Sequence, residues 1–115
     1  MSNIFVFGSN LAGLHYGGSA KEAVNKQGAI MGVGVGPQGN SYAIPTLDAD
    51  FKQLQLWIVK GFVDEFIDYA KENPDKVFDV VAIGCGIAGF TPEQIAPMFK
   101  DAPNNCNLSK EFKND

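Results

Sequence analysis

Two glycine-rich stretches of this 115-residue chain carry side chains that have the chemistry of a base or a nucleophile. Residues 8–19 read GSNLAGLHYGGS, and residues 83–90 read IGCGIAGF. His15 could act as a base or donate a hydrogen bond to phosphate or ribose, and a structural or exposed histidine is an equal alternative. Cys85 would be a nucleophile if a helix N-terminus lowered its pKa. The sequence places no acid–base partner beside it, which favours a small apolar residue in a tight loop.

The second stretch has the pattern of a strand, a glycine loop and a helix. Residues 77–83 are an apolar, β-branched run that predicts a buried strand. Residues 91–94, TPEQ, form a capping box with proline at the first helical position. Glycines at positions 84, 86 and 89 are expected to adopt positive φ and to turn several N–H groups toward one point, as in phosphate sites. A tight turn that binds nothing is the alternative.

The first stretch repeats this pattern. An apolar strand is predicted at residues 4–7, and a helix follows with Ser19 and Glu22 as a capping box and Gly28 as its C-terminal stop. Two glycine loops at the carboxyl ends of two strands, each leading into a helix, are typical of the ligand crevice of an open α/β sheet.

The remaining elements fit one α/β domain with a mixed, mostly parallel sheet flanked by helices. A third strand is predicted at residues 42–46 and a second capped helix at 92–100. Apolar residues at i+4 spacing predict a helix over 50–72, in which the aromatic stripe is core packing. The domain is expected to span residues 1–102, followed by a polar tail over 103–115 that is poorly ordered except near two apolar side chains, Leu108 and Phe112.

Three details of the long helix are also predicted. Asp50 with Gln53 is expected to cap its start, and Asn73 before a proline is expected to end it. Gly61 in its middle costs about 1 kcal/mol relative to alanine, which suggests close packing on the sheet.

Residues 34–39, GVGPQG, match the G-x-G-x-x-G pattern of dinucleotide sites. That pattern needs a following helix and free N–H groups, whereas Pro37 lacks an N–H and the motif runs into a predicted strand. These glycines are therefore expected to let the chain lie close to a neighbour or a ligand.

Composition narrows the possible partners. The net charge of −4 disfavours nucleic acid and anionic membranes. The chain has no arginine, so a phosphate would have to be held by backbone N–H groups. Cys85 and Cys106 have no metal-ligand spacing, and free thiols in a reducing, cytoplasmic compartment are expected. No signal peptide, membrane span, metal or cofactor is predicted.

Together the two loops resemble those of a macro domain, the α/β module that binds ADP-ribose. The run FGSN followed by HYGG is similar to that family's first loop, with Asn10 at the position near the distal ribose. Residues 83–90 resemble the phosphate loop of the subclass that hydrolyses terminal ADP-ribose on glutamate. The resemblance implies a ligand-binding set at both loops and at the end of the third strand: Gly8, Ser9, Asn10, His15, Tyr16, Gly17, Gly18, Thr46, Gly84, Cys85, Gly86, Ile87, Ala88, Gly89 and Phe90.

The departures from this subclass concern catalysis. Its phosphate loop carries an aspartate where this chain has Ala88, and its lysine corresponds to Leu47. The aspartate that holds adenine in macro domains has no counterpart here. The resemblance therefore favours non-catalytic binding of ADP-ribose or a related NAD-derived nucleotide, with no catalytic residue. It suggests sequestration of a nucleotide signal, as small phage proteins do against bacterial immunity.

Two other functions remain open, as does the oligomeric state. A hydrolase or phosphatase acting on ADP-ribose derivatives could use His15 or Asp48, the nearest carboxylate, although a turn or a helix cap is the alternative role for Asp48. An interaction protein with degenerate loops is the third hypothesis.

Overall fold

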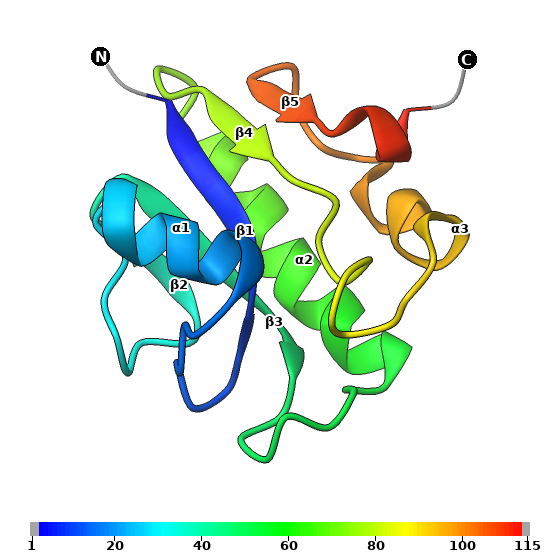
Figure 1. Ribbon diagram of the computed structural model, residues 1–115. Helices are drawn as coiled ribbons and strands as arrows, with labels where there is room; N and C mark the ends of the chain where they lie inside the picture. The colour runs from blue at the N-terminus through cyan, green and yellow to red at the C-terminus, as the bar shows by residue number, and fades with distance from the viewer. Residues whose placement is uncertain (1–2, 114–115) are drawn as a thin grey trace.

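The computed structural model describes residues 3–113 and contains a five-stranded sheet with the strand order β2-β3-β1-β4-β5 (Figure 1). The strands are β1 (Ile4–Asn10), β2 (Gly36–Gln38), β3 (Ser41–Leu47), β4 (Phe78–Val80) and β5 (Cys106–Leu108). Only the β2–β3 pair is antiparallel. The predicted α/β class with a mixed, mostly parallel sheet is confirmed.

Three α-helices accompany the sheet: α1 (Gly18–Lys26), α2 (Leu56–Glu72) and α3 (Pro92–Ile95). Two short 3₁₀ helices, η1 (Ala96–Phe99) and η2 (Lys110–Phe112), complete the fold. None of the helices within the described part of the chain has the length and apolar character needed to cross a membrane.

Alternation along β1 sends side chains into two separate cores. Phe7 packs on one face with alanines of α1, Ala20 and Ala23, whereas Val6 joins the larger core on the other face. That larger core lies under α2, whose Phe66 ring is 5.4 Å from the ring of Phe78 between centroids. The aromatic stripe of this helix is therefore core packing, as predicted. Figure 1 shows α1 and α2 on opposite faces of the sheet.

The long helix begins later than predicted. Its N-cap is Gln55, because the preceding residues form a tight turn in which the Asp48 carboxylate accepts hydrogen bonds from the N–H groups of Asp50 and Lys52. Asp48 therefore takes the turn role. The predicted end at Asn73 is confirmed.

Gly61 differs from its prediction. It is exposed, and a methyl group added there would have no atom within 4 Å, so close packing on the sheet is wrong.

The strand predicted at 77–83 is short, and the predicted tail is part of the sheet. After β4 the N–H of Ile83 bonds the carbonyl of Val81 at 2.7 Å, which turns the chain out of the ladder. Residues 106–108 pair with β4 as β5, and Phe112 is buried against Phe99. Order restricted to the two apolar side chains is therefore wrong for residues 103–113, while 114–115 lie outside the described residues.

One of the two predicted capping boxes forms and the other does not. Thr91 and Gln94 form the full capping box at α3, which confirms that prediction, although α3 is only one turn and continues as η1. The box predicted at Ser19 is absent, because α1 already begins at Gly18 and its N-cap, Gly17, makes no side-chain hydrogen bond. Gly28 adopts φ +77° just past the helix, as expected of a stop.

Candidate functional site

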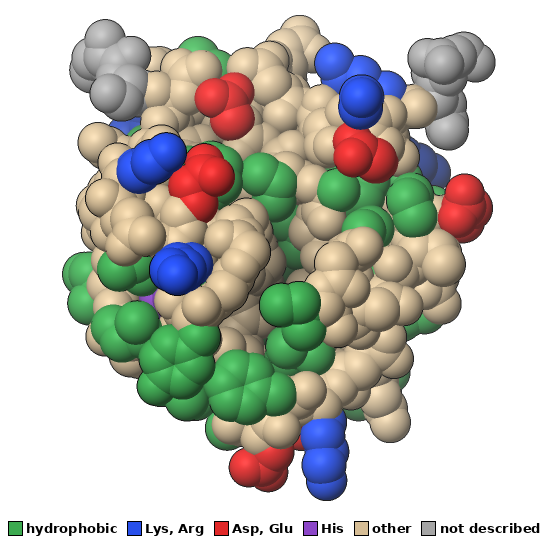
Figure 2. All heavy atoms as spheres, in the orientation of Figure 1, with side chains coloured by type: hydrophobic (Ala, Val, Ile, Leu, Met, Phe, Trp, Pro, Cys, Tyr) green, Lys and Arg blue, Asp and Glu red, His purple; other side chains and the backbone are tan. Residues whose placement is uncertain are grey.

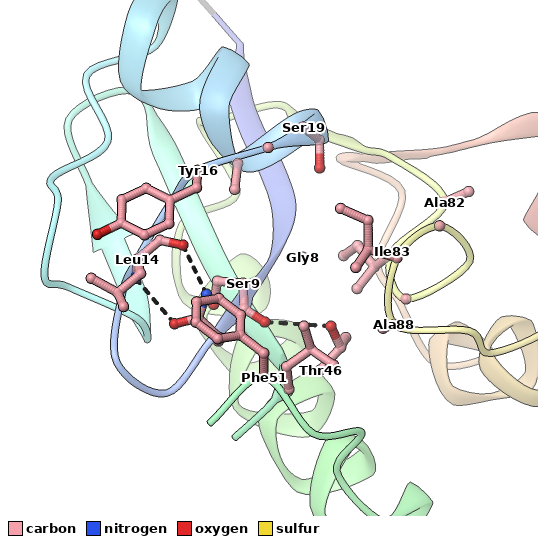
Figure 3. Close-up of a pocket in the computed structure, with 18 residues that line it drawn as sticks. Gly8, Ser9, Leu14, Tyr16, Ser19, Thr46, Phe51, Ala82, Ile83 and Ala88 are labelled. Carbon is pink, nitrogen blue, oxygen red and sulfur yellow. Dashed lines mark hydrogen bonds between the residues drawn. The ribbon is translucent and has the colours of Figure 1, made fainter. Parts of the chain in front are cut away.

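A cavity of about 330 Å³ opens at the carboxyl ends of β1 and β3 (Figure 3). The loop after β1 leads to α1 on one face of the sheet, whereas those after β3 and β4 lead to helices that pack in the core on the other face. Divergence of neighbouring loops leaves a crevice at this edge, where open α/β sheets bind ligands. Both glycine loops line the cavity, as the sequence predicts.

The loop after β4 presents backbone donors to the cavity. Within the described residues, the N–H groups of Cys85, Gly89 and Phe90 bond carbonyls of the same loop at 2.8–3.1 Å. The N–H groups of Gly84 and of residues 86–88 have no such acceptor among residues 3–113. These four residues line the cavity, so their N–H groups are the ones available to an anion.

The start of α1 supplies a second set of donors. The first N–H groups of a helix have no partner inside the helix, and no side chain caps this one. Residues 17–20 line the cavity, and the positive end of the helix dipole lies there. Ile87 of the other loop approaches Gly17 closely, because a methyl group on Gly17 would lie 3.7 Å from its Cδ1. The two donor sets therefore meet at one cavity.

The conformation of the second loop is fixed by two of its three glycines. Gly84 and Gly89 adopt φ values of +78° and +82°, as predicted. Gly86 does not adopt positive φ, so that part of the prediction is wrong. A side chain at Gly86 would meet open space, which means that its glycine is not required by the fold.

A contact from the loop after β3 braces the same segment. The side-chain amide of Gln53 donates to the carbonyl of Ala88 at 2.8 Å. Gln53 therefore positions residues 83–90, the phosphate-loop candidate. Its predicted role was to cap a helix.

Eleven of the fifteen predicted site residues line the cavity, and four do not. The eleven are Gly8, Ser9, Asn10, Tyr16, Gly17, Gly18, Thr46, Gly84, Gly86, Ile87 and Ala88. The four that lie outside the lining are His15, Cys85, Gly89 and Phe90.

His15 is buried beside the cavity wall. Its ring packs edge-on against Phe7 at 5.2 Å, and its Nε2 lies 3.0 Å from the carbonyl of Val33. Since a carbonyl only accepts, Nε2 carries the hydrogen. This geometry corresponds to the structural alternative. Its Nδ1 is buried without a hydrogen-bond partner among residues 3–113, and His15 is not part of the cavity lining.

Cys85 also lacks the features of a nucleophile. Burial raises the pKa of its thiol, and Glu111 and Glu93 raise it further. The thiol points to the carbonyl of Ile83, with the Sγ atom 3.6 Å from the oxygen. The pKa is therefore raised and not lowered, and the site corresponds to the alternative of a small residue in a tight loop.

The polar side chains at the cavity floor hold the backbone in place. Asn10 donates to the carbonyl of Leu14 at 2.9 Å and accepts from its N–H at 3.0 Å, which closes the loop after β1. Ser9 donates to the carbonyl of Gly34, and Thr46 to the carbonyl of Ser9 at 3.4 Å. These groups shape the cavity more than they offer free donors to it (Figure 3).

Gly34 and Gly39 act as the sequence predicts, by letting the chain approach a neighbour, whereas a methyl group on Gly36 would have no neighbour within 4 Å and Gly36 instead adopts φ +90°. A methyl group on Gly34 would lie 2.2 Å from the carbonyl oxygen of Asn10, and one on Gly39 would lie 2.4 Å from that of Gly28. Residues 36–38 form β2 and not a pyrophosphate loop.

Sequence reasoning missed seven of the lining residues: Leu14, Ser19, Ala20, Leu47, Phe51, Ala82 and Ile83. Most are apolar neighbours of predicted residues and carry no chemical signal. Phe51 is different, because it comes from a loop that the sequence assigned to a helix. An aromatic side chain directly after an aspartate-rich turn was the available signal.

The cavity lining contains no Asp, Glu, Lys or His side chain among residues 3–113. Across the described ranges no three His, Cys, Asp or Glu side chains cluster as metal ligands. An anion in this cavity would therefore be neutralised by backbone dipoles.

No family model and no curated protein matches the chain. A solved structure described as a protein of unknown function from Bacteroides thetaiotaomicron is similar in fold, with a TM-score of 0.64 and 13% sequence identity. The match covers 95% of this chain and 88% of that one. The overall fold is thus similar to that of a solved protein of similar extent.

Proposed function

We propose that this protein binds a nucleotide diphosphate of the ADP-ribose type, ADP-ribose itself or a related NAD-derived nucleotide, without cleaving it. The observation that carries the proposal is the pair of donor sets on residues that line one cavity: the uncapped N-terminus of α1, and the N–H groups of Gly84 and residues 86–88, which are unpaired among residues 3–113. Two donor sets suit two phosphates, and backbone donors suit a chain without arginine.

The size and lining of the cavity agree with this proposal. Its volume of about 330 Å³ is at the lower end of small-molecule sites. The resemblance of both loops to a macro domain supports the same ligand class. A protein that holds such a ligand without changing it would act by sequestering it.

Binding is favoured over hydrolysis by the residues at the two departures from the hydrolase subclass. Ala88 and Leu47 both line the cavity, where the subclass has an aspartate and a lysine. Hydrolysis needs a base or nucleophile at the reacting atom, and His15 and Cys85 lie outside the lining.

The experiment is calorimetric titration and thermal melting with ADP-ribose, ADP, cyclic ADP-ribose and inorganic pyrophosphate. Ligand at 100 times its dissociation constant adds about 2.7 kcal/mol of stability, which corresponds to roughly 10 °C for a domain of this size. Chromatography of ADP-ribose after overnight incubation should recover it intact. An unmoved melting transition with millimolar ligand would refute binding, and cleavage products would refute the non-catalytic reading.

A further inference from the structure

Phe51 has an unusual backbone conformation at the edge of the cavity. Its φ of +63° makes it the one non-glycine residue of the described chain in the left-handed region. That region is costly for a bulky L-residue, and such strain persists only where surrounding contacts impose it. Phe51 lines the cavity, and its side chain is 46% exposed.

The turn that carries Phe51 is held by hydrogen bonds at both ends. Asp48 accepts from the N–H groups of Asp50 and Lys52, and its own N–H donates to the carbonyl of Lys52 at 2.8 Å. The N–H of Phe51 bonds the carbonyl of Asp48 at 3.1 Å. Next to it, Gln53 reaches the carbonyl of Ala88. The backbone that carries the phenyl ring is thus held in place beside the loop at residues 83–90, and the ring lines the cavity.

A second aromatic side chain lies at the cavity margin. Tyr16 is 65% exposed and lines the same cavity from the loop after β1. Neither the ring of Tyr16 nor that of Phe51 is paired with another aromatic ring among residues 3–113. Figure 3 shows both rings on one side of the pocket, across from Ile83 and Ala88, and Figure 2 shows hydrophobic side chains gathered over this part of the surface.

We infer that Phe51 is the stacking platform for the nucleobase of the bound nucleotide, with Tyr16 as the second aromatic wall, and that the site reads the ring face and not the base edge. This inference rests on the proposed function, since it assigns the base end of a ligand whose phosphates lie at the two donor sets. Stacking on an aromatic ring is available to every base, because every base has a π-face.

Two polar side chains of the cavity lining are already hydrogen-bonded to the backbone, which is why they would not read the base edge. The amide of Asn10 is bonded to Leu14 through both its oxygen and its nitrogen, and the hydroxyl of Thr46 is bonded to Ser9. The described lining has no charged side chain that could pair with the Watson–Crick edge of a base. Discrimination between bases of similar size would therefore be weak.

The test compares four probes by calorimetry: ADP, IDP, ribose 5-phosphate and inorganic pyrophosphate. ADP and IDP differ only at the base edge, and their dissociation constants should agree within about threefold if the edge is unread. Phe51→Leu keeps an apolar side chain without the ring, and it should weaken ADP by roughly 5- to 150-fold, the range of base–aromatic stacking. Pyrophosphate affinity should stay unchanged, because its contacts are backbone groups elsewhere.

Tryptophan fluorescence provides a second test, which applies even if the Phe51→Leu variant is unstable. In a Trp57→Phe background, Phe51→Trp places the one tryptophan at the cavity, and ADP should quench its fluorescence. Trp57 is a suitable residue to replace, since it is 73% exposed and bonds only Gln55. Ribose 5-phosphate should give no quenching.

The outcomes separate the two proposals. If neither ADP-ribose nor any of the four probes binds, the proposed function fails and the base subsite fails with it. If ADP-ribose binds and ADP does not, only the base subsite is wrong. If ADP binds but Phe51→Leu leaves its affinity unchanged, only the stacking platform is wrong. A tenfold or greater preference for ADP over IDP would show that the site does recognise the base edge, which contradicts the inference. If Phe51→Leu changes the oligomeric state seen in sedimentation and leaves the affinity for ADP unchanged, Phe51 serves self-association and the inference is overturned.

Discussion

Replacing Gly86 by valine separates a ligand-binding role of the phosphate-loop candidate from a purely structural one. Gly86 has neither positive φ nor a neighbour within 4 Å of an added methyl group. Valine should therefore change the free energy of unfolding by less than about 0.5 kcal/mol. Its side chain would stand beside the N–H groups of residues 86–88 and block an anion from reaching them.

The expected loss of affinity follows from the hydrogen bonds that are blocked. A hydrogen bond to a charged group contributes about 1.5–3 kcal/mol, so loss of two of them costs at least about 3 kcal/mol. Since 1.4 kcal/mol is tenfold in affinity, the dissociation constant for ADP-ribose should rise at least ~100-fold.

Two control substitutions isolate this effect. Gly61→Val makes the same change at an exposed helical position with open space around it, and it should leave affinity unchanged. Gly84→Ala should instead destabilise the fold by about 1–2 kcal/mol, because its φ is +78° and its methyl group would lie 3.0 Å from the Phe90 ring. Calorimetric titration and thermal melting of all three variants measure both quantities. Unchanged affinity in a folded Gly86→Val protein would show that the loop is only a turn.

Four further outcomes are expected. Gly61→Ala should raise stability by about 1 kcal/mol without changing ligand affinity, and a lower melting temperature would contradict the exposed position of this residue. Ala88→Asp should weaken nucleotide binding by repulsion of phosphate and create no hydrolysis, which chromatography of the incubated nucleotide checks. Thr91→Ala should cost about 1 kcal/mol by removing the capping box, seen as a melting temperature lower by roughly 4 °C. Burial raises the pKa of Cys106 to about 11, so the folded chain holds this proton more tightly than the unfolded chain does. The contribution of Cys106 to the free energy of unfolding is therefore fully present below about pH 9 and is lost as the pH rises toward 11. In denaturant titrations, Cys106→Ser should make the free energy of unfolding fall less steeply over this range.

The elements that sequence patterns predicted well are those with strong local signals. The i+4 stripe of α2 carries the helical period, and the apolar runs at β1 and β3 are short and bounded by turn residues, which favours strands. The capping box at α3 is likewise local, because Thr91 and Gln94 bond each other's backbone and need no distant partner. The placing of both glycine loops at one crevice followed from strand order rules.

The elements that were missed depend on distant partners. β5 is three residues in a polar segment, and it forms because β4 offers an unpaired edge and Phe112 finds a place in the core. The start of α2 was misplaced because the Asp48 turn competes for the same residues, and side chains that bond nearby backbone are suited to turns as well as to caps. His15 was a candidate base because of its residue type, and only the fold places it against Phe7 and Val33.

The three α-helices differ in how the backbone N–H groups at their starts are satisfied. At α3 the chain satisfies its own donors with Thr91 and Gln94. At α2 a side-chain cap is also missing, but the residues at its start, Gln55 and Leu56, do not line the cavity, whereas residues 17–20 at the start of α1 do. At α1 the cap is a glycine without a side chain, although a serine or threonine there would stabilise the helix by a few tenths of a kcal/mol or more. A Cβ on Gly17 would lie 3.7 Å from Cδ1 of Ile87, and both residues line the cavity. Gly17→Ser should therefore raise the melting temperature while lowering nucleotide affinity, and a variant that gains stability with no loss of affinity would refute the role of this helix start in binding.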